Sequence, residues 1–113
     1  MTETRPTVLI TGAAGNLGAA VVAHFAGQGA RLLLADRNAG ALRQHYGGIA
    51  DAELVEVNLL DREQVADRIG QAIARAGRVD VLCHLAGGFH MGERVRDTPA
   101  AAWDLMMDLN ARS

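Results

Sequence analysis

Four short apolar runs, each followed by a helical pattern, limit the possible folds of this chain more than any other feature. The runs are rich in Val, Leu and Ile and occupy residues 7–11, 31–35, 53–57 and 79–85. Helical patterns fill residues 17–28, 38–46, 61–76 and 98–113. Because strands joined through helices return in the same direction, the alternation predicts a parallel sheet covered by helices on both faces. We expect an α/β, doubly wound sheet of about four strands in the order 3-2-1-4.

Capping residues and apolar periodicity mark the helices. Asp61 is expected to cap the third helix, with Gln64 as its capping-box partner. Thr98 and Pro99 are typical of an N-cap and a first helical turn, and they predict a last helix that contains Trp103. The apolar positions expected to face the core are Leu17, Val21, Val22 and Phe25, then Leu42, and then Val65, Ile69, Ile73 and Ala76.

Length and composition exclude several classes of protein. A chain of 113 residues, half of them hydrophobic and 21% charged, suits one packed domain. A net charge of −2 argues against a nucleic-acid partner. No apolar run reaches the roughly 18 residues that a membrane helix needs. The N-terminus lacks the layout of a signal peptide, and the single Cys83 suggests a reducing compartment, so we expect a cytoplasmic location.

The chain contains eleven Arg and no Lys, one tyrosine, Tyr46, and one serine, Ser113. Without Lys, this sequence holds no Walker A loop, no Schiff-base lysine and no Tyr/Lys or Ser/Lys pair. We interpret Cys83 as an inert thiol on a buried strand. His84 is either a group near a ligand or a hydrogen-bonded core histidine. His24, His45 and His90 share no metal-ligand spacing, so no metal site is expected.

A glycine-rich turn follows the first run and leads into the first helix, through Thr11-Gly12-Ala13-Ala14-Gly15-Asn16-Leu17-Gly18. Gly12 permits a tight turn, Gly15 lets the backbone approach a diphosphate, and Gly18 allows close packing of helix on strand. A strand before the glycines and a helix after them are what a Rossmann-type dinucleotide site requires. The alternative is a plain strand–helix turn that favours glycine.

Asp36 directly follows the second run, at the end of the predicted strand, and its carboxylate is placed to accept hydrogen bonds from both ribose hydroxyls of an adenosine. The same charge repels a 2′-phosphate, which favours NAD over NADP. Arg37 complicates this preference, because a guanidinium beside the ribose pairs with a 2′-phosphate or stacks on adenine. The alternative is that Asp36 is a helix N-cap or a solvated turn residue.

These motifs resemble those of the short-chain dehydrogenase/reductase family over essentially the whole chain. The glycine turn resembles the TGxxGxxG form of its extended branch, whereas the single-domain branch has a glycine where Asn16 stands. Residues 58–61 are similar to the D-[VL]-T-D segment, with Asn58 in place of the first Asp. Residues 84–87 align with the N-N-A-G segment, although both asparagines are missing. Residues 103–110 resemble the helix that carries the asparagine of the catalytic tetrad.

The resemblance implies a cofactor, NAD or NADP, and a set of site residues. The residues expected to bind it are Thr11, Gly12, Gly15, Asn16, Leu17, Gly18, Asp36, Arg37, Asn58, Leu59, Ala86, Gly87 and Gly88. Asn58 is expected at the adenine edge, and residues 86–88 form a wall of small residues against the nicotinamide ribose. Asn110 corresponds to the tetrad asparagine, which in the family stabilises a helix distortion and holds a water of the proton relay.

The family's serine and Tyr-x-x-x-Lys motif lie beyond the position of Asn110, where this sequence has three more residues. We therefore expect residues 1–113 to be a dinucleotide-binding domain, truncated before the catalytic region and inactive by itself. The corresponding full-length protein is expected to transfer hydride between a nicotinamide cofactor and an alcohol or carbonyl substrate. An incomplete sheet exposes an apolar edge, so we expect a homo-oligomer or contact with a missing C-terminal half.

Two other functions remain open at this point. A non-catalytic nucleotide-sensing or interaction module uses the same fold, and the lack of Tyr/Lys favours it, whereas Asn110 favours an enzyme. An adenosylmethionine-dependent methyltransferase also has a glycine turn and an acid after the second strand. Its cofactor has no diphosphate, so nothing in it requires three glycines around two phosphates.

Overall fold

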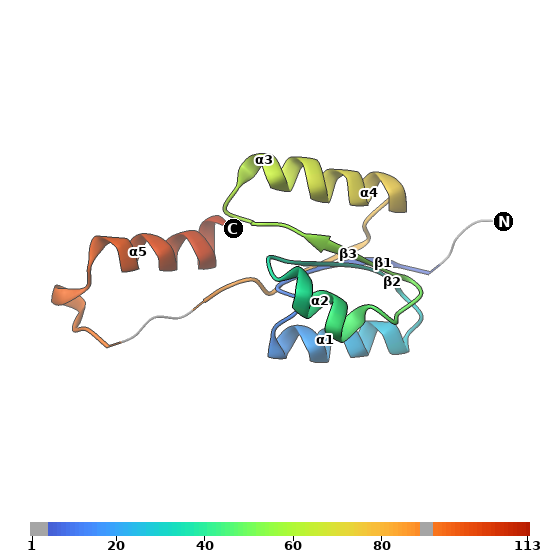
Figure 1. The fold of residues 1–113 in the computed structure, drawn as a ribbon, viewed down its shortest axis with the longest axis horizontal. Coiled ribbons are helices and arrows are strands. Elements are labelled where there is room, and N and C mark those ends of the chain that lie inside the picture. The colour runs from blue at the N-terminus through green and yellow to red at the C-terminus, as the bar shows by residue number, and fades with distance from the viewer. Residues whose placement is uncertain (1–4, 89–91) are drawn as a thin grey trace.

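The structure is a computed structural model, which describes residues 5–88 and 92–113. Its four strands form one parallel sheet in the order β3-β2-β1-β4, as the alternation predicted (Figure 1). The strands are β1 (Thr7–Thr11), β2 (Arg31–Asp36), β3 (Ala52–Glu56) and β4 (Val81–His84). The helices are α1 (Asn16–Gly27), α2 (Ala39–Tyr46), α3 (Arg62–Gln64), α4 (Gly70–Ala76) and α5 (Ala100–Met107).

Helices cover both faces of the sheet, with α1 and α2 on one face and the α3–α4 segment on the other (Figure 1). Successive residues of a strand point to opposite faces, so each central strand contributes to two cores. Val8 and Ile10 of β1 pack with Val22 of α1 and Leu42 of α2. Leu9 instead packs on the opposite face. This double burial explains why the middle of each strand, residues 8–10 of β1 and 32–35 of β2, is apolar without interruption.

The first helix differs from the prediction in the side chain that it turns inward. Val22 is buried as expected, but Leu17 is 64% exposed and does not belong to the core face. Gly18 takes the inward position instead. Gly18 lies close to the backbone of residues 12 and 13, so this side of the helix faces the turn and the preceding side chain, Leu17, faces solvent.

The third helical segment begins as predicted. The Asp61 carboxylate accepts hydrogen bonds from the backbone N–H groups of Glu63 and Gln64, at 3.1 and 3.2 Å. Gln64 departs from a standard capping box, because its Oε1 accepts from the backbone N–H of Asn58 at 3.0 Å. A π-helical turn at Val65–Ile69, which the periodicity did not predict, joins α3 to α4.

The fourth strand is shorter and less buried than predicted. Only Val81–His84 is extended, and its burial alternates, with Leu82 60% exposed and Cys83 half-buried. The cause is the topology: in the described residues β4 pairs with β1 alone and is therefore an edge strand. The prediction of a fully buried strand was wrong for this reason, although Cys83 does pack against the core.

The last helix starts with a different cap from the predicted one. Pro99 is the N-cap of α5, and the Thr98 hydroxyl donates to the carbonyl of Arg94 at 3.1 Å rather than capping the helix. The helix continues into a π-helical turn, η3 (Asp108–Arg112), so the predicted distortion near Asn110 is present. None of the α5 side chains is buried, and Trp103 is 61% exposed.

The helix α5 lies beyond the carboxyl ends of the strands and lengthens the molecule (Figure 1). The molecule measures 59 × 27 × 23 Å, and its radius of gyration is 15.7 Å. A compact chain of this size has a radius of gyration of about 13 Å. No helix in the described ranges is long and apolar enough to span a bilayer.

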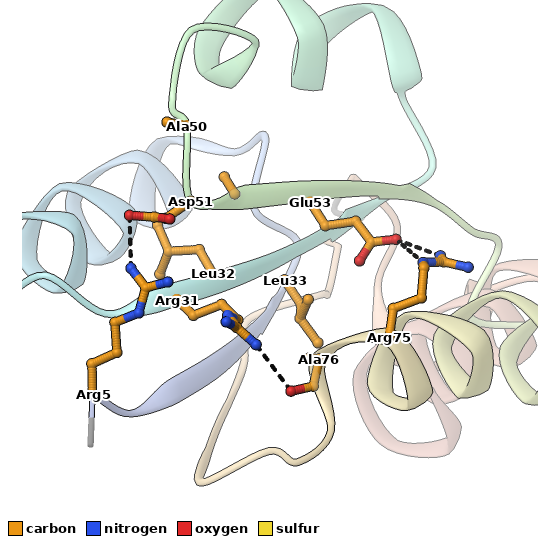
Figure 2. A pocket seen from close by; sticks show the side chains of 10 residues that line it. Arg5, Arg31, Leu32, Leu33, Ala50, Asp51, Glu53, Arg75 and Ala76 are labelled. Carbon is orange, nitrogen blue, oxygen red and sulfur yellow. Dashed lines mark hydrogen bonds and ion pairs between the residues drawn. The ribbon is translucent and has the colours of Figure 1, made fainter. Parts of the chain in front are cut away.

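Ion pairs surround a pocket of about 290 Å³ at the amino ends of the strands (Figure 2). Arg5 pairs with Asp51 at 2.7 Å, and the Arg75 Nε donates to Glu53 at 2.7 Å. Arg31 of β2 donates to the carbonyl of Ala76 at the end of α4, at 3.0 Å. These contacts tie the chain before β1 to the start of β3, and both β2 and β3 to α4.

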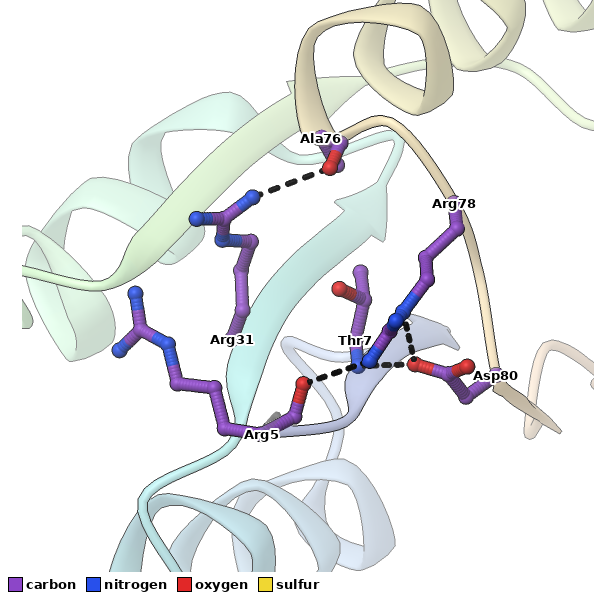
Figure 3. A network of polar contacts seen from close by, with 6 residues as sticks. All are labelled: Arg5, Thr7, Arg31, Ala76, Arg78 and Asp80. Carbon is purple, nitrogen blue, oxygen red and sulfur yellow. Dashed lines mark hydrogen bonds and ion pairs between the residues drawn. The ribbon is translucent and has the colours of Figure 1, made fainter. Parts of the chain in front are cut away.

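A second polar network lies beside this pocket and ties β1 to β4 (Figure 3). The Asp80 Oδ2 accepts from the backbone N–H of Thr7 at 2.8 Å and from the Arg78 Nε at 3.1 Å. The Arg78 guanidinium also donates to the carbonyl of Arg5 at 3.1 Å. The Thr7 hydrogen bond, together with Arg78, holds the pKa of Asp80 below its ordinary value.

Candidate functional site

A cleft of about 210 Å³ opens at the carboxyl ends of the strands. In a doubly wound parallel sheet, ligands bind at the carboxyl ends of the strands, at the point where the strand order reverses. The order 3-2-1-4 places the reversal between β1 and β4. The residues that line the cleft are Gly12, Gly15, Asp36, Arg37, Val57, Asn58, Leu59, Leu60, Leu85, Ala86, Gly87, Leu109 and Ser113.

The glycine turn follows β1 directly and forms one wall of the cleft. Gly12 has φ +68°, a conformation that residues with a Cβ rarely adopt. A Cβ on Gly12 would also lie 2.8 Å from the backbone N of Ala86. The turn is closed by a hydrogen bond from the Gly15 N–H to the Gly12 carbonyl at 3.2 Å. Gly12 is therefore required both by its dihedral angle and by the closeness of the β4 side.

Gly18 and Gly15 differ in what surrounds them. A Cβ on Gly18 would lie 2.5 Å from the Ala13 carbonyl oxygen, so only glycine allows the helix to pack here. A Cβ on Gly15 would meet only the Gly12 oxygen, at 3.4 Å. Gly15 has an ordinary extended conformation, with φ −78° and ψ 174°, and it lines the cleft. The protein itself therefore leaves space at Gly15.

The amino end of α1 faces this turn. Gly15 is the N-cap of the helix, and no side chain caps it. The first helical hydrogen bond runs from the Ala19 N–H to the Gly15 carbonyl at 2.9 Å. The N–H groups of Asn16, Leu17 and Gly18 thus precede the helical ladder. Such a helix end is partially positive and suits an anion.

Asp36 ends β2 and lines the cleft beside Arg37. Its Oδ2 accepts from the backbone N–H of Ala14 at 3.1 Å, and its Oδ1 accepts from that of Asn38 at 3.0 Å. The N-cap of α2 is Asn38, whose side chain accepts from the Ala41 N–H at 3.0 Å. Asp36 is therefore not the N-cap. Its bond to the N–H two residues further on does form a local turn, as the other alternative expected, and Asp36 also lines the cleft.

Asn58 and Leu59 follow β3 and form the next part of the cleft. The Asn58 Oδ1 accepts from the backbone N–H of Leu60 at 3.0 Å, which makes a local turn. Gln64 holds the Asn58 backbone N–H. Both bonds fix the backbone of this segment, while the Asn58 side-chain NH₂ group keeps donors for a polar ligand edge.

The β4 side of the cleft is held by Thr11 and His84. The Thr11 Oγ1 accepts from the backbone N–H of Leu85 at 3.1 Å and lies 2.7 Å from the Nδ1 of His84. His84 Nε2 lies 3.3 Å from the hydroxyl of Ser113. Thr11 and His84 therefore fix the backbone of this wall through hydrogen bonds, although neither of them lines the cleft.

Asn110 holds the segment of small residues after β4. Its Oδ1 accepts from the Gly88 N–H at 3.0 Å, and its Nδ2 donates to the Gly88 carbonyl at 3.0 Å and to the Met106 carbonyl at 2.9 Å. A Cβ on Gly87 would lie 2.6 Å from the same Oδ1. One side chain thus links the π-helical turn after α5 to both polar groups of Gly88.

The predicted site residues fall into two groups. Gly12, Gly15, Asp36, Arg37, Asn58, Leu59, Ala86 and Gly87 line the cleft together, although they come from four separate segments. Thr11, Asn16, Leu17, Gly18, Gly88 and Asn110 lie around it without lining it. His90 lies outside the described residues, and among the described ones no three potential ligands gather as a metal site.

Sequence reasoning missed several residues of the site. Val57, Leu60, Leu85 and Leu109 line the cleft and make it largely apolar. Val57 and Leu85 follow β3 and β4 at their carboxyl ends, and that position was the signal that could have identified them. Tyr46 was also missed: its hydroxyl donates to the Ala13 carbonyl in the glycine turn at 2.5 Å. Burial, with a contribution from the Asp36 charge, raises the pKa of Tyr46.

The sequence of this chain is similar to those of known dehydrogenases and reductases. The family model of the short chain dehydrogenases matches residues 6–113. The human hydroxysteroid dehydrogenase-like protein 2 is 31% identical over 117 residues, a match that covers 94% of this chain and 28% of that protein. The CLA biosynthesis dehydrogenase/reductase of Lactiplantibacillus plantarum is 31% identical over 110 residues, covering 94% of this chain and 38% of that protein.

A solved structure shows the same fold. The 3-ketoacyl-(acyl-carrier-protein) reductase from Brucella melitensis, complexed with NADH, superposes with a TM-score of 0.85 at 25% identity. The match covers 95% of this chain and 44% of that one, so the chain spans less than half the length of each relative named here. The strand order, the glycine turn and the match over residues 6–113 agree: the chain belongs to the short-chain dehydrogenase family.

Proposed function

We propose that this chain is the dinucleotide-binding part of an oxidoreductase that transfers hydride between a nicotinamide cofactor and an alcohol or carbonyl substrate. The observation that carries the proposal is the cleft at the carboxyl ends of the strands, which brings Gly12, Gly15 and Asp36 together. An apolar cleft with a few polar groups that converge on it is the usual form of a cofactor site. The NADH complex of the Brucella reductase supports the same choice of cofactor.

The residues of the glycine turn fit a diphosphate. The N–H groups at the start of α1 point beyond the helix end and donate to an anion without a competing side-chain cap. Gly15 has free space on the cleft side, which a phosphate oxygen fills and a methyl group would block. The residues here thus bind the group through the backbone alone, so no Lys is needed.

Asp36 and Arg37 set the preference between the two dinucleotides. The Asp36 carboxylate already accepts two backbone N–H groups, which fix its orientation. It accepts the hydroxyls of the adenosine ribose and repels a 2′-phosphate. Arg37, on the same wall, stacks on the adenine or partly offsets this repulsion. We therefore favour NAD, with NADP as the weaker ligand.

The opposite wall orients the nicotinamide end. NAD supplies the hydride acceptor when bound. Ala86 and Gly87 present a low wall of small residues, and Asn110 holds the adjacent Gly88 in place through both of its backbone polar groups. We propose that the serine, tyrosine and lysine that complete proton transfer in the family come from sequence beyond this chain. The 113-residue chain then binds the dinucleotide without turnover.

Calorimetric titration with NADH and NADPH tests the proposal. We expect NADH to bind more tightly, and we expect an Asp36→Ala variant to lose about tenfold in NADH affinity, because hydrogen bonds to a charged group contribute about 1.5–3 kcal/mol. The matched control is Asp67→Ala on the π-helical turn η1 (Val65–Ile69), where the Asp67 carboxylate accepts from the Gln71 side chain at 2.7 Å. No heat from either dinucleotide, or unchanged discrimination in the Asp36 variant, contradicts the proposal.

A further inference from the structure

One peptide group of the glycine turn is bonded at both ends by side chains from elsewhere in the fold. The peptide that joins Ala13 to Ala14 receives the Tyr46 hydroxyl on its carbonyl oxygen, at 2.5 Å. Its N–H donates to the Asp36 Oδ2 at 3.1 Å. Because the peptide is trans, its C=O and N–H point in opposite directions, so the two side chains hold it from opposite sides.

The Tyr46 contact is buried, whereas the Asp36 contact is at the cleft. Ala13 is fully buried and Tyr46 is 6% exposed, within the core between the sheet, α1 and α2. Tyr46 does not line the cleft, so it cannot touch a ligand there. Any effect on binding must pass through the peptide that it holds.

The orientation of this peptide decides the charge that the turn presents. In the observed orientation the carbonyl dipole points into the core and the N–H points to Asp36. A rotated peptide would leave the Tyr46 hydroxyl without its acceptor and would place a carbonyl oxygen against the Asp36 carboxylate. Both changes are unfavourable, and the second also turns negative charge toward an incoming diphosphate.

We propose that Tyr46 is a positioning residue for the diphosphate-binding turn: its hydroxyl fixes the Ala13–Ala14 peptide, and thereby the turn's affinity for ligands that carry a diphosphate. The inference rests on the proposed function, because it assigns a role toward the same cofactor. It goes beyond that function in placing the control of phosphate affinity at the end of α2, outside the cleft.

The test compares ADP with adenosine as competitors of NADH in a calorimetric displacement experiment. We expect Tyr46→Phe to weaken ADP and NADH about fivefold to tenfold, the equivalent of one hydrogen bond, and to leave adenosine within about twofold. The control is Leu42→Ala on the same helix, since Leu42 packs in the same core but has no polar group that could bond to the turn. This variant should lower the melting temperature and keep the ratio of ADP to adenosine affinity.

A second measurement does not depend on the variant folding. Tyr46 is the only tyrosine of the chain, so ultraviolet titration of the wild-type protein follows its ionisation alone. If the protonated hydroxyl positions the turn, ADP binds that form better and must raise the pKa of Tyr46 by linkage, whereas adenosine must not.

The outcomes separate the two proposals. A wild-type protein that binds neither NADH nor ADP overturns the proposed function. A wild-type protein that binds both, together with a Tyr46→Phe variant that weakens ADP and adenosine equally or not at all, overturns the role of Tyr46 alone. A Leu42→Ala variant that changes the ratio as much as Tyr46→Phe also overturns that role, as does ADP leaving the Tyr46 titration unmoved.

Discussion

Tyr46 and Asp36 hold opposite ends of one peptide group, the Tyr46 hydroxyl through the Ala13 carbonyl and the Asp36 carboxylate through the Ala14 N–H. Asp36 is the last residue of β2 and Tyr46 the last residue of α2, so two elements meet at the turn after β1. The two residues also interact electrostatically, because the Asp36 charge contributes to the raised pKa of Tyr46. A residue proposed to bind ribose and a residue buried in the core thus act on the same segment of backbone.

This relationship predicts how Tyr46 responds to a change at Asp36. Asp36→Asn removes a negative charge beside the phenol and should lower the pKa of Tyr46 toward its ordinary value of 10.0. Burial, the larger cause, remains, so the pKa should stay above that value. Ultraviolet titration of the single tyrosine measures the pKa of Tyr46 in the wild-type and Asp36→Asn proteins. Equal pKa values would show that Tyr46 and Asp36 do not interact.

The same raised pKa predicts a loss of stability in alkali. The folded state binds the Tyr46 proton more tightly than the unfolded state, so this contribution is fully present below pH 10 and is lost as the pH rises through the folded-state pKa. Denaturant unfolding at a series of alkaline pH values should show the loss in the wild-type protein. Tyr46→Phe has no phenol to ionise and should show a correspondingly flatter profile.

Two glycines of the turn should respond differently to one added methyl group. Gly18→Ala places a Cβ against the Ala13 and Gly12 carbonyls and should reduce the free energy of unfolding by about 1–3 kcal/mol. Gly15→Ala meets no such contact, and its backbone conformation suits alanine, so it should cost less than about 1 kcal/mol.

The Gly15→Ala substitution, which should cost little stability, should have a large effect on NADH binding. Gly15→Ala fills the space proposed for the diphosphate and should weaken NADH at least about tenfold, the equivalent of about 1.4 kcal/mol. Denaturant unfolding and calorimetry on the same preparations give both quantities. A Gly15→Ala protein that keeps wild-type NADH affinity would remove Gly15 from the site.

Acid should weaken the polar network at the amino ends of β1 and β4. The backbone N–H of Thr7, and then Arg78, lower the pKa of Asp80 below its ordinary value of 3.8. A lowered pKa means that this stabilisation is present above about pH 3.8 and is lost as the pH falls through the folded-state pKa. Asp80→Asn should therefore be less stable near neutral pH and should lose less stability in acid. Asp67→Asn, on the outer helical segment, is the control, and an equal acid response in both variants would contradict the assignment.

The edge of β4 predicts association of the chain. Leu82 lies on this edge strand with 60% of its surface exposed, and exposed apolar edge strands pair with other chains. We expect the 113-residue chain to elute from size-exclusion chromatography as a concentration-dependent oligomer. Leu82→Lys should shift it toward the monomer, whereas Val95→Lys, at a residue 93% exposed on η2 (Val95–Asp97), should not. A stable wild-type monomer at all concentrations would refute this prediction.

Features that depend on neighbouring residues were predictable from the sequence. The strands β1 and β2 coincide with the predicted apolar runs. Both faces of these strands are buried, so no polar residue interrupts either run. The turn was predictable because the positive φ of Gly12 and the close approach at Gly18 each require glycine at one position. The cap at Asp61 was predictable because it involves adjacent backbone groups.

Features that depend on tertiary packing were not predictable from the sequence. The spacing of Leu17 fits a helical face and predicts a core position, but Gly18 takes the position against the turn at residues 12 and 13, and Leu17 is exposed. The bond from Tyr46 to Ala13 joins residues 33 positions apart and leaves no local pattern. The wall at Ala86 and Gly87 was expected only from the family resemblance, because small residues alone do not indicate a contact with a ligand.

A crystal structure of the protein with NADH tests the central claim most directly. We expect the diphosphate to lie against the backbone of residues 12–18, and the adenosine ribose hydroxyls to lie within hydrogen-bond distance of the Asp36 carboxylate. The nicotinamide ribose should lie along residues 86–88. Density for the dinucleotide outside this cleft, or a cleft that stays empty at saturating NADH, would contradict it.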